Sequence, residues 1–122
     1  KVMLFHYIWT SSHGKSGKRY LLENIPPQNV QNVNMLPIIV GDFNCVTSQI
    51  DVEANFHQKQ SKELRTFLSL FQYKDSFRQL YGDSIEFTFS RPGVSCSRLD
   101  RAYLPLHLQD LLKEIKHITT LK

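Results

Sequence analysis

One short apolar run constrains the fold of this chain more than any other segment. Residues 37–40 are apolar, and Gly41 ends the run. A run this short, closed by a glycine and free of polar alternation, is typical of a strand buried on both faces, as in a parallel sheet. Such a strand must be covered by other secondary structure, so the segment predicts a layered α/β architecture.

Helix and strand patterns alternate along the rest of the chain. A helix is predicted that Ser61 can cap. Its apolar face is made of residues spaced i, i+3, i+4 and i+7, namely Leu64, Phe67, Leu68 and Phe71. The other predicted elements are strands at residues 2–8, 86–89, 97–104 and 115–121, helical turns at 19–25, 75–80 and 105–112, and a long loop at 42–60. Strands interleaved with helices predict a mixed α/β (α+β) fold.

The composition narrows the class of protein. With 122 residues, of which 41% are hydrophobic and 21% charged, the chain matches a globular domain or a piece of one. No apolar run is long enough for a membrane helix, so no membrane partner is expected. Cys45 and Cys96 are too few for a disulfide framework, which predicts an intracellular setting. The net charge of +4 favours an anionic partner such as nucleic acid.

Two polar side chains follow the buried run directly. Asp42 and Asn44 lie at the carboxyl end of the predicted strand, which is where ligands bind in α/β sheets. Because they are two positions apart, extended geometry can point both the same way. A carboxylate can accept a proton from water, and an amide can donate to an oxyanion. The alternative is an Asx turn, in which both side chains satisfy only the local backbone.

A second candidate is Asp100, in the middle of the strand predicted at 97–104. Aspartate is disfavoured in strands, so its presence there needs a reason. The flanking Arg98 and Arg101 are expected to hold the carboxylate ionised. The alternative is an ordinary ion pair on a solvated strand face.

Taken together, four segments resemble the endonuclease/exonuclease/phosphatase superfamily, which has the DNase I-like fold. Gly-Asp-Phe-Asn at 41–44 resembles its Gly-Asp-hydrophobic-Asn motif, and Ser-Arg-Leu-Asp-Arg at 97–101 resembles its Ser-Arg-hydrophobic-Asp strand. Phe-Thr-Phe at 87–89 is similar to the aromatic-Thr-aromatic strand of that superfamily. Asp-Ser-Phe-Arg at 75–78 is similar to a stretch of LINE-type (non-LTR) retrotransposon endonucleases. The resemblance implies a two-sheet sandwich with outer helices, here a partial domain over residues 1–122 truncated at both ends.

The resemblance also implies an activity, Mg²⁺-dependent hydrolysis of a phosphodiester in DNA by the endonuclease of a retrotransposon. Its implied partners are DNA and the reverse-transcriptase region of the same polyprotein, and its implied setting is the nucleus. The site residues that it implies are Asp42 to activate water, Asn44 to stabilise phosphoryl oxygens, Tyr7 to hold the phosphate, Asp100 to orient a histidine, and Thr88 and Arg98 on the substrate side.

The sequence also departs from the pattern of the superfamily. Ile8 and Trp9 follow Tyr7 where the superfamily has a small residue and a proline. The alternative that Tyr7 only packs in the core as a strand aromatic therefore stays open. No counterpart is found for the metal-binding Glu or for the closing Ser-Asp-His triplet, and the five histidines are scattered without metal-ligand spacing. Little or no activity is therefore expected. Two alternatives stay open: a non-catalytic remnant of a retrotransposon, or a phosphatase of the same fold acting on inositol lipids.

Overall fold

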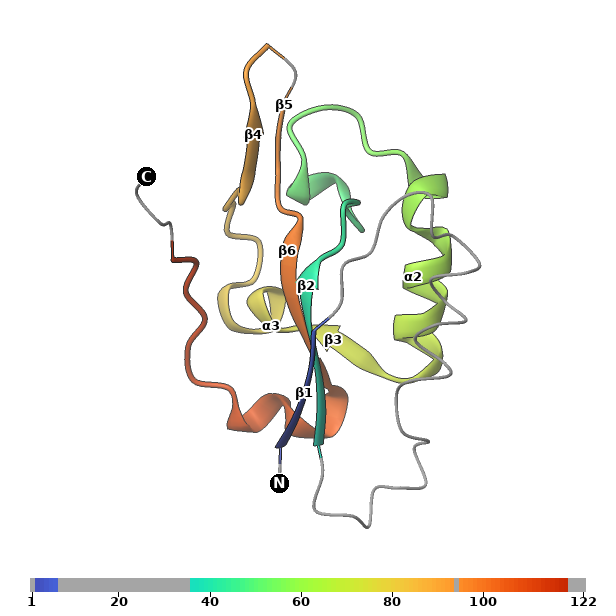
Figure 1. The fold of residues 1–122 in the computed structure, drawn as a ribbon, viewed down its shortest axis with the longest axis vertical. Helices are drawn as coiled ribbons and strands as arrows, with labels where there is room; N and C mark the ends of the chain where they lie inside the picture. Colours follow the sequence, from blue (N-terminus) through green and yellow to red (C-terminus); the bar gives the residue numbers. More distant parts are fainter. Residues whose placement is uncertain (1, 7–35, 94, 119–122) are drawn as a thin grey trace.

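A four-stranded mixed sheet forms the centre of the molecule. The computed structural model describes residues 2–6, 36–93 and 95–118 (Figure 1). The strand order is β1-β2-β6-β3, with bounds Val2–His6, Leu36–Asp42, Asp100–Pro105 and Tyr73–Asp75 for β1, β2, β6 and β3. β1 runs parallel to β2, whereas β6 runs antiparallel to both β2 and β3. The fold is thus of the α+β class, as the sequence predicts.

The apolar run that constrains the fold lies in β2, between two other strands. β2 continues two residues beyond the predicted 37–40, so that Gly41 and Asp42 still belong to the sheet. Gly41 pairs with Arg101 of β6, and Asp42 pairs with Asp100. The predicted parallel pairing is present, but only on the β1 side.

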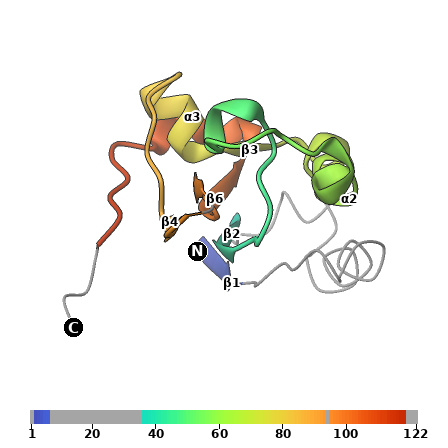
Figure 2. The same cartoon turned by 90° about the horizontal axis from the view of Figure 1, so that it is seen from above.

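The helix α2 (Gln58–Leu70) covers one face of the sheet (Figure 2). Its predicted apolar face is confirmed, because Leu64 and Phe67 are buried in the core of the molecule. The other members of this core are Ile39, Phe43, Cys45, Leu68, Tyr73 and Tyr103, with Phe71 packed against them. The predicted cap is wrong, because the helix begins at Gln58 after His57. Ser61 lies inside the helix and accepts a hydrogen bond from Nε of Arg65 at 3.1 Å.

Two short strands form a separate antiparallel hairpin, β4 (Phe89–Arg91) with β5 (Ser95–Ser97), which projects from the sheet (Figure 1). The strand predicted at 97–104 is therefore two strands, β5 and β6. Arg98 and Leu99 interrupt the ladder, because the side chain of Arg98 turns into a buried ion-pair network there. The strand predicted at 86–89 is likewise corrected, since only Phe89 belongs to β4.

Three short helices and one short strand complete the described part of the chain. η2 (Gln49–Asp51) lies within the segment predicted as a loop. α3 (Ser76–Tyr81) and η3 (Leu106–Leu111) fall where helical turns are predicted. The three-residue β3 is too short to leave a pattern in the sequence.

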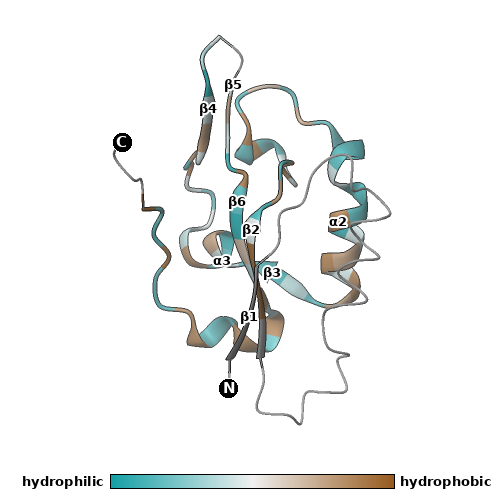
Figure 3. Cartoon of the chain, viewed as in Figure 1, coloured by the Kyte–Doolittle hydropathy of each residue, from teal (hydrophilic) through white to brown (hydrophobic). Residues whose placement is uncertain are grey.

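Some predicted elements are absent or fall elsewhere. The strand predicted at 115–121 is not found over 115–118, and 119–122 lie outside the described residues, as does the helix predicted at 19–25. In Figure 3 apolar and polar stretches alternate along α2, as expected of a helix with one buried face. Over the residues that the structure describes, no helix is both long and apolar enough to span a bilayer.

Candidate functional site

The sheet brings the two predicted carboxylates together at one end. Asp42 is the last residue of β2, Asp100 is the first residue of β6, and the two are direct partners in the antiparallel ladder. Such partners project from the same face of a sheet, with Cβ atoms about 4.5–5.5 Å apart. Two like charges in this arrangement repel each other and lower stability. A proton, a cation or a hydrogen-bonding ligand between them would offset that cost.

A cavity of about 300 Å³ borders both carboxylates. Val40 and Ala102, the preceding pair on the same sheet face, also line it. Phe77 of α3 lines it as well. The segment after η3 also lines the cavity, through Ile115, Lys116 and His117. The remaining lining residues are Gly41, Arg98 and Arg101. The cavity therefore lies on the sheet face opposite α2, at the carboxyl end of β2.

Asp42 is held in place by an Asx turn. Its Oδ1 accepts a hydrogen bond from the backbone N–H of Asn44 at 2.9 Å. This is the alternative that the sequence left open, and it is present together with the position beside the cavity. Between them, Phe43 is fully buried, and its N–H donates to the carbonyl of Leu99 at 2.9 Å. The turn therefore limits how far the carboxylate of Asp42 can move.

Asn44 is not brought to the cavity. It has a left-handed backbone, with φ of 51°, a conformation that asparagine tolerates better than most residues. Its side chain is exposed, and Asn44 is not among the residues that border the cavity. Its contribution in this structure is the conformation of the turn.

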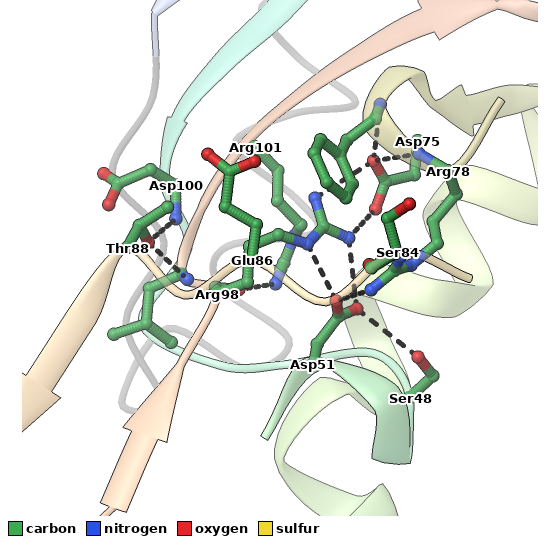
Figure 4. A network of polar contacts seen from close by, with 12 residues as sticks. Ser48, Asp51, Asp75, Arg78, Ser84, Glu86, Thr88, Arg98, Asp100 and Arg101 are labelled. Atoms are coloured by element: carbon green, nitrogen blue, oxygen red, sulfur yellow. Dashed lines mark hydrogen bonds and ion pairs between the residues drawn. The ribbon is translucent and has the colours of Figure 1, made fainter. Parts of the chain in front are cut away.

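Thr88 anchors the backbone that carries Asp100. Its Oγ1 accepts hydrogen bonds from the N–H groups of Leu99 at 2.9 Å and Asp100 at 3.1 Å (Figure 4). Its own N–H donates to the carbonyl of Ser97 at 3.0 Å. Thr88, which the resemblance assigns to the substrate side, thus ties the base of the hairpin to the first residue of β6.

Arg98 lies in a buried ion-pair network rather than beside Asp100. Its side chain is 0% exposed, and Nε and Nη2 donate to the carboxylate of Asp51 at 2.7 and 3.1 Å. Its Nη1 and Nη2 donate to Asp75, and Arg78 donates to Asp51 from the other side (Figure 4). The expected contact of Arg98 with Asp100 is therefore not found, and the nitrogens of Arg98 are occupied by the carboxylates of Asp51 and Asp75.

Charge explains how this network is tolerated. Burial by itself would raise the pKa of Asp51, but hydrogen bonds and charge from Arg98 and Arg78 outweigh it and hold that pKa below its ordinary value. Burial lowers the pKa of Arg98, and its bonds to Asp51 and Asp75 reverse that and raise it above its ordinary value. Asp51 and Arg98 are therefore charged at neutral pH, and their pairing stabilises both of them.

Arg101 points to the opposite face of the sheet from Asp100. Its Nη1 donates to the carbonyls of Cys45 at 2.7 Å and Arg98 at 3.0 Å. Its guanidinium carbon lies 5.1 Å from the ring centre of Phe43. Successive residues of a strand alternate between faces, so Arg101 is directed into the core that α2 covers. The expected contact of Arg101 with the carboxylate of Asp100 is therefore not found.

The structure also shows a pair that the sequence did not predict. Nδ1 of His117 lies 2.5 Å from Oε1 of Glu86, and Nε2 lies 3.4 Å from the carbonyl oxygen of Asp100. His117 borders the cavity. Its partner is far away in the chain, so no local pattern could have indicated the pair.

Tyr7 lies outside the described residues.

The described residues do not by themselves make a metal site. The carboxylates of Asp42 and Asp100 are the kind of oxygen ligand that Mg²⁺ prefers. However, within residues 2–6, 36–93 and 95–118 no group of three or more His, Cys, Asp or Glu side chains could hold a metal ion.

Comparison with known proteins assigns no family to the chain. No protein-family model matches it, and no curated protein matches it.

Proposed function

We propose that the chain is part of a DNase I-like domain that hydrolyses phosphodiester bonds in DNA, as the endonuclease of a LINE-type retrotransposon does. The observation that carries the proposal is the direct pairing of Asp42 with Asp100 beside a cavity. These two carboxylates come from the two segments that the sequence resemblance assigns to one site.

The proposed chemistry needs a group that takes a proton from water. The carboxylate of Asp42 is fixed by its turn and faces the cavity, so it can orient or deprotonate an attacking water. The backbone N–H of Asp100 is bound by Thr88, and Asp100 lies opposite Asp42 in the ladder. The resemblance implies Mg²⁺ as a cofactor, and this part of the proposal is tested below by removing the ion.

The proposed fold is the two-sheet sandwich of that superfamily. α2 covers one face of the four-stranded sheet, whereas Val40 and Ala102 on the other face are only half-buried. A second sheet packed on that face would bury both residues and close the cavity from above. The incomplete cover on this face is what supports the proposal.

DNA binding gives the deciding test. We expect slow nicking of supercoiled plasmid or none, because the sequence has no counterpart to the metal-binding Glu or to the Ser-Asp-His triplet. Binding does not need turnover. Without Mg²⁺, a phosphate near Asp42 and Asp100 is repelled by both carboxylates, so Asp42→Asn and Asp100→Asn should each tighten binding to a short duplex several-fold.

The control is Asp110→Asn, which removes an exposed charge on η3. It should leave the affinity unchanged in fluorescence anisotropy at fixed salt. Adding Mg²⁺ should strengthen binding of the wild-type chain, and EDTA should reverse the gain. If none of the variants changes the affinity, or if the chain does not bind DNA, the catalytic proposal fails and a non-catalytic remnant is the better description.

A further inference from the structure

The segment that follows η3 forms one wall of the cavity and is fastened at two points. The hydroxyl of Tyr81 donates to the carbonyl of Ile115 at 3.1 Å and accepts from its N–H at 3.2 Å. Two residues further on, the ring of His117 contacts Glu86. This wall is therefore held by α3 and by the irregular segment before β4 that contains Glu86, rather than by the sheet that carries the carboxylates.

The contact with Glu86 determines which ring nitrogen of His117 is available. A carboxylate accepts hydrogen bonds, so Nδ1, at 2.5 Å from Oε1 of Glu86, carries the proton that is donated. Nε2 is 3.4 Å from the carbonyl of Asp100, which is longer than a good hydrogen bond. Nε2 is thus the nitrogen that a ligand in the cavity can reach, and the carboxylate on Nδ1 fixes the orientation of the ring.

The cavity is lined by hydrogen-bond acceptors and donors together. Asp42 and Asp100 border it, and so do Lys116 and His117, which are themselves paired with Glu114 and Glu86. The side chain of His117 is 27% exposed, so a ligand can approach it. A phosphate ester fits this lining, because its oxygens can accept hydrogen bonds from Lys116 and His117 while water or a hydroxyl group faces the carboxylates.

We infer that His117, oriented by Glu86 through Nδ1–H and carrying a second proton on Nε2, donates a hydrogen bond from Nε2–H to an oxygen of a phosphate ester bound in this cavity, and that in hydrolysis it protonates the leaving oxygen. This deepens the proposed function and depends on it. The oxygen of water bonds to phosphorus, the bond from phosphorus to the ester oxygen breaks, Asp42 takes a proton of the water, and Nε2 of His117 gives its proton to the leaving oxygen. Proton exchange with solvent restores both groups. The histidine is not part of the Ser-Asp-His triplet of the superfamily.

Binding is tested with the dinucleotide TpT and with inorganic phosphate, followed by the ring resonances of ¹⁵N-histidine-labelled protein. The resonances of His117 should shift saturably with either probe, whereas those of the exposed His107 on η3 should not. Glu86→Ala removes the partner of Nδ1 and should weaken TpT binding about tenfold. Glu86→Gln keeps an oxygen acceptor at that position and should weaken it less. Far-UV circular dichroism shows whether each variant is folded.

The proton-donor role is tested by the leaving group. His117→Ala should slow hydrolysis of TpT by about 100-fold or more, because its leaving alkoxide needs a proton. The same variant should slow hydrolysis of bis(4-nitrophenyl) phosphate by less than tenfold, because nitrophenolate leaves without one. His107→Ala is the matched control and should change neither rate.

The outcomes separate the inference from the proposed function. If TpT does not shift the resonances of His117, or shifts those of His107 equally, the binding inference is wrong. If His117→Ala slows both substrates equally or neither, the proton-donor role is wrong while the proposed function stands. If TpT binds at His117 but the wild-type protein turns over neither substrate, the site binds phosphate esters and the proton-donor role is wrong, whereas the proposed function is decided by the DNA-binding test.

Discussion

Removing Asp51 should destabilise the protein more than removing any exposed charge. Asp51 is 1% exposed and accepts hydrogen bonds from the fully buried Arg98 and from Arg78. Asp51→Ala would leave the guanidinium of Arg98 in the interior with only Asp75 as its partner. Breaking a buried ion pair by deleting one member costs about 3–5 kcal/mol, because the remaining charge stays without solvent.

Thermal and urea unfolding followed by far-UV circular dichroism measure this cost. For a chain of this size 1 kcal/mol lowers Tm by roughly 4 °C, so a decrease of about 12–20 °C is expected. The control is Glu114→Ala, which breaks an ion pair with Lys116 whose two side chains are 59% and 74% exposed. Exposed pairs contribute under about 1 kcal/mol, so this variant should melt within a few degrees of the wild type.

A double-mutant cycle distinguishes coupling from local damage. Arg98→Met combined with Asp51→Ala should cost less than the sum of the single variants, because both charges of this pair are then removed together, although Asp75 and Arg78 each lose one partner. If Asp51→Ala lowers Tm no more than Glu114→Ala does, or if the double variant is simply additive, the network does not stabilise the fold and the reasoning fails.

Three further predictions concern pH, the backbone anchor and the core. The lowered pKa of Asp51 means that its stabilising contribution is complete above the ordinary pKa of an aspartate, about 4, and is lost as pH falls through the lowered value. Tm should therefore decrease with acid below about pH 4 in the wild type, with a shallower decrease in Asp51→Asn. Thr88→Val removes the acceptor of two N–H groups and should cost about 1–3 kcal/mol in urea unfolding, whereas Thr88→Ser should cost less than half of that. Phe67→Ala in the core should cost about 3–5 kcal/mol, against under about 1 kcal/mol for Leu70→Ala, whose side chain is 62% exposed on the same helix; equal costs would contradict the assigned core.

Elements with a local period could be predicted from the sequence. The buried run in β2 and the face of α2 that carries Leu64 and Phe67 each follow a pattern that spans only a few residues of sequence. Both are found in the core. The start of α2 could not be placed, because His57 caps it without a side-chain hydrogen bond. Ser61, the better capping residue, instead bonds to Arg65 one turn further along.

The candidate site could be predicted only in part. Asp42 and Asp100 were singled out by their sequence contexts, and the antiparallel pairing of β2 with β6 brings them together. The sequence could not indicate that Arg98 binds Asp51 rather than Asp100, because Asp51 lies in a segment without a hydrophobic period. The pair of His117 and Glu86 could not be predicted at all, since it depends on how two irregular segments pass each other.

The pairing of β2 with β6 also disfavours any other register of these two strands at the site. Because side chains alternate along a strand, sliding β6 by one residue against β2 would turn Asp100 toward the core and bring Tyr103 out of it. A carboxylate would then have to be buried among apolar side chains, and a large aromatic ring would be lost from contact with Phe43. The packing of Tyr103 under α2 therefore favours the register in which Asp100 lies opposite Asp42. The hydrophobic residues on one face of the sheet thus determine the positions of the carboxylates on the other face.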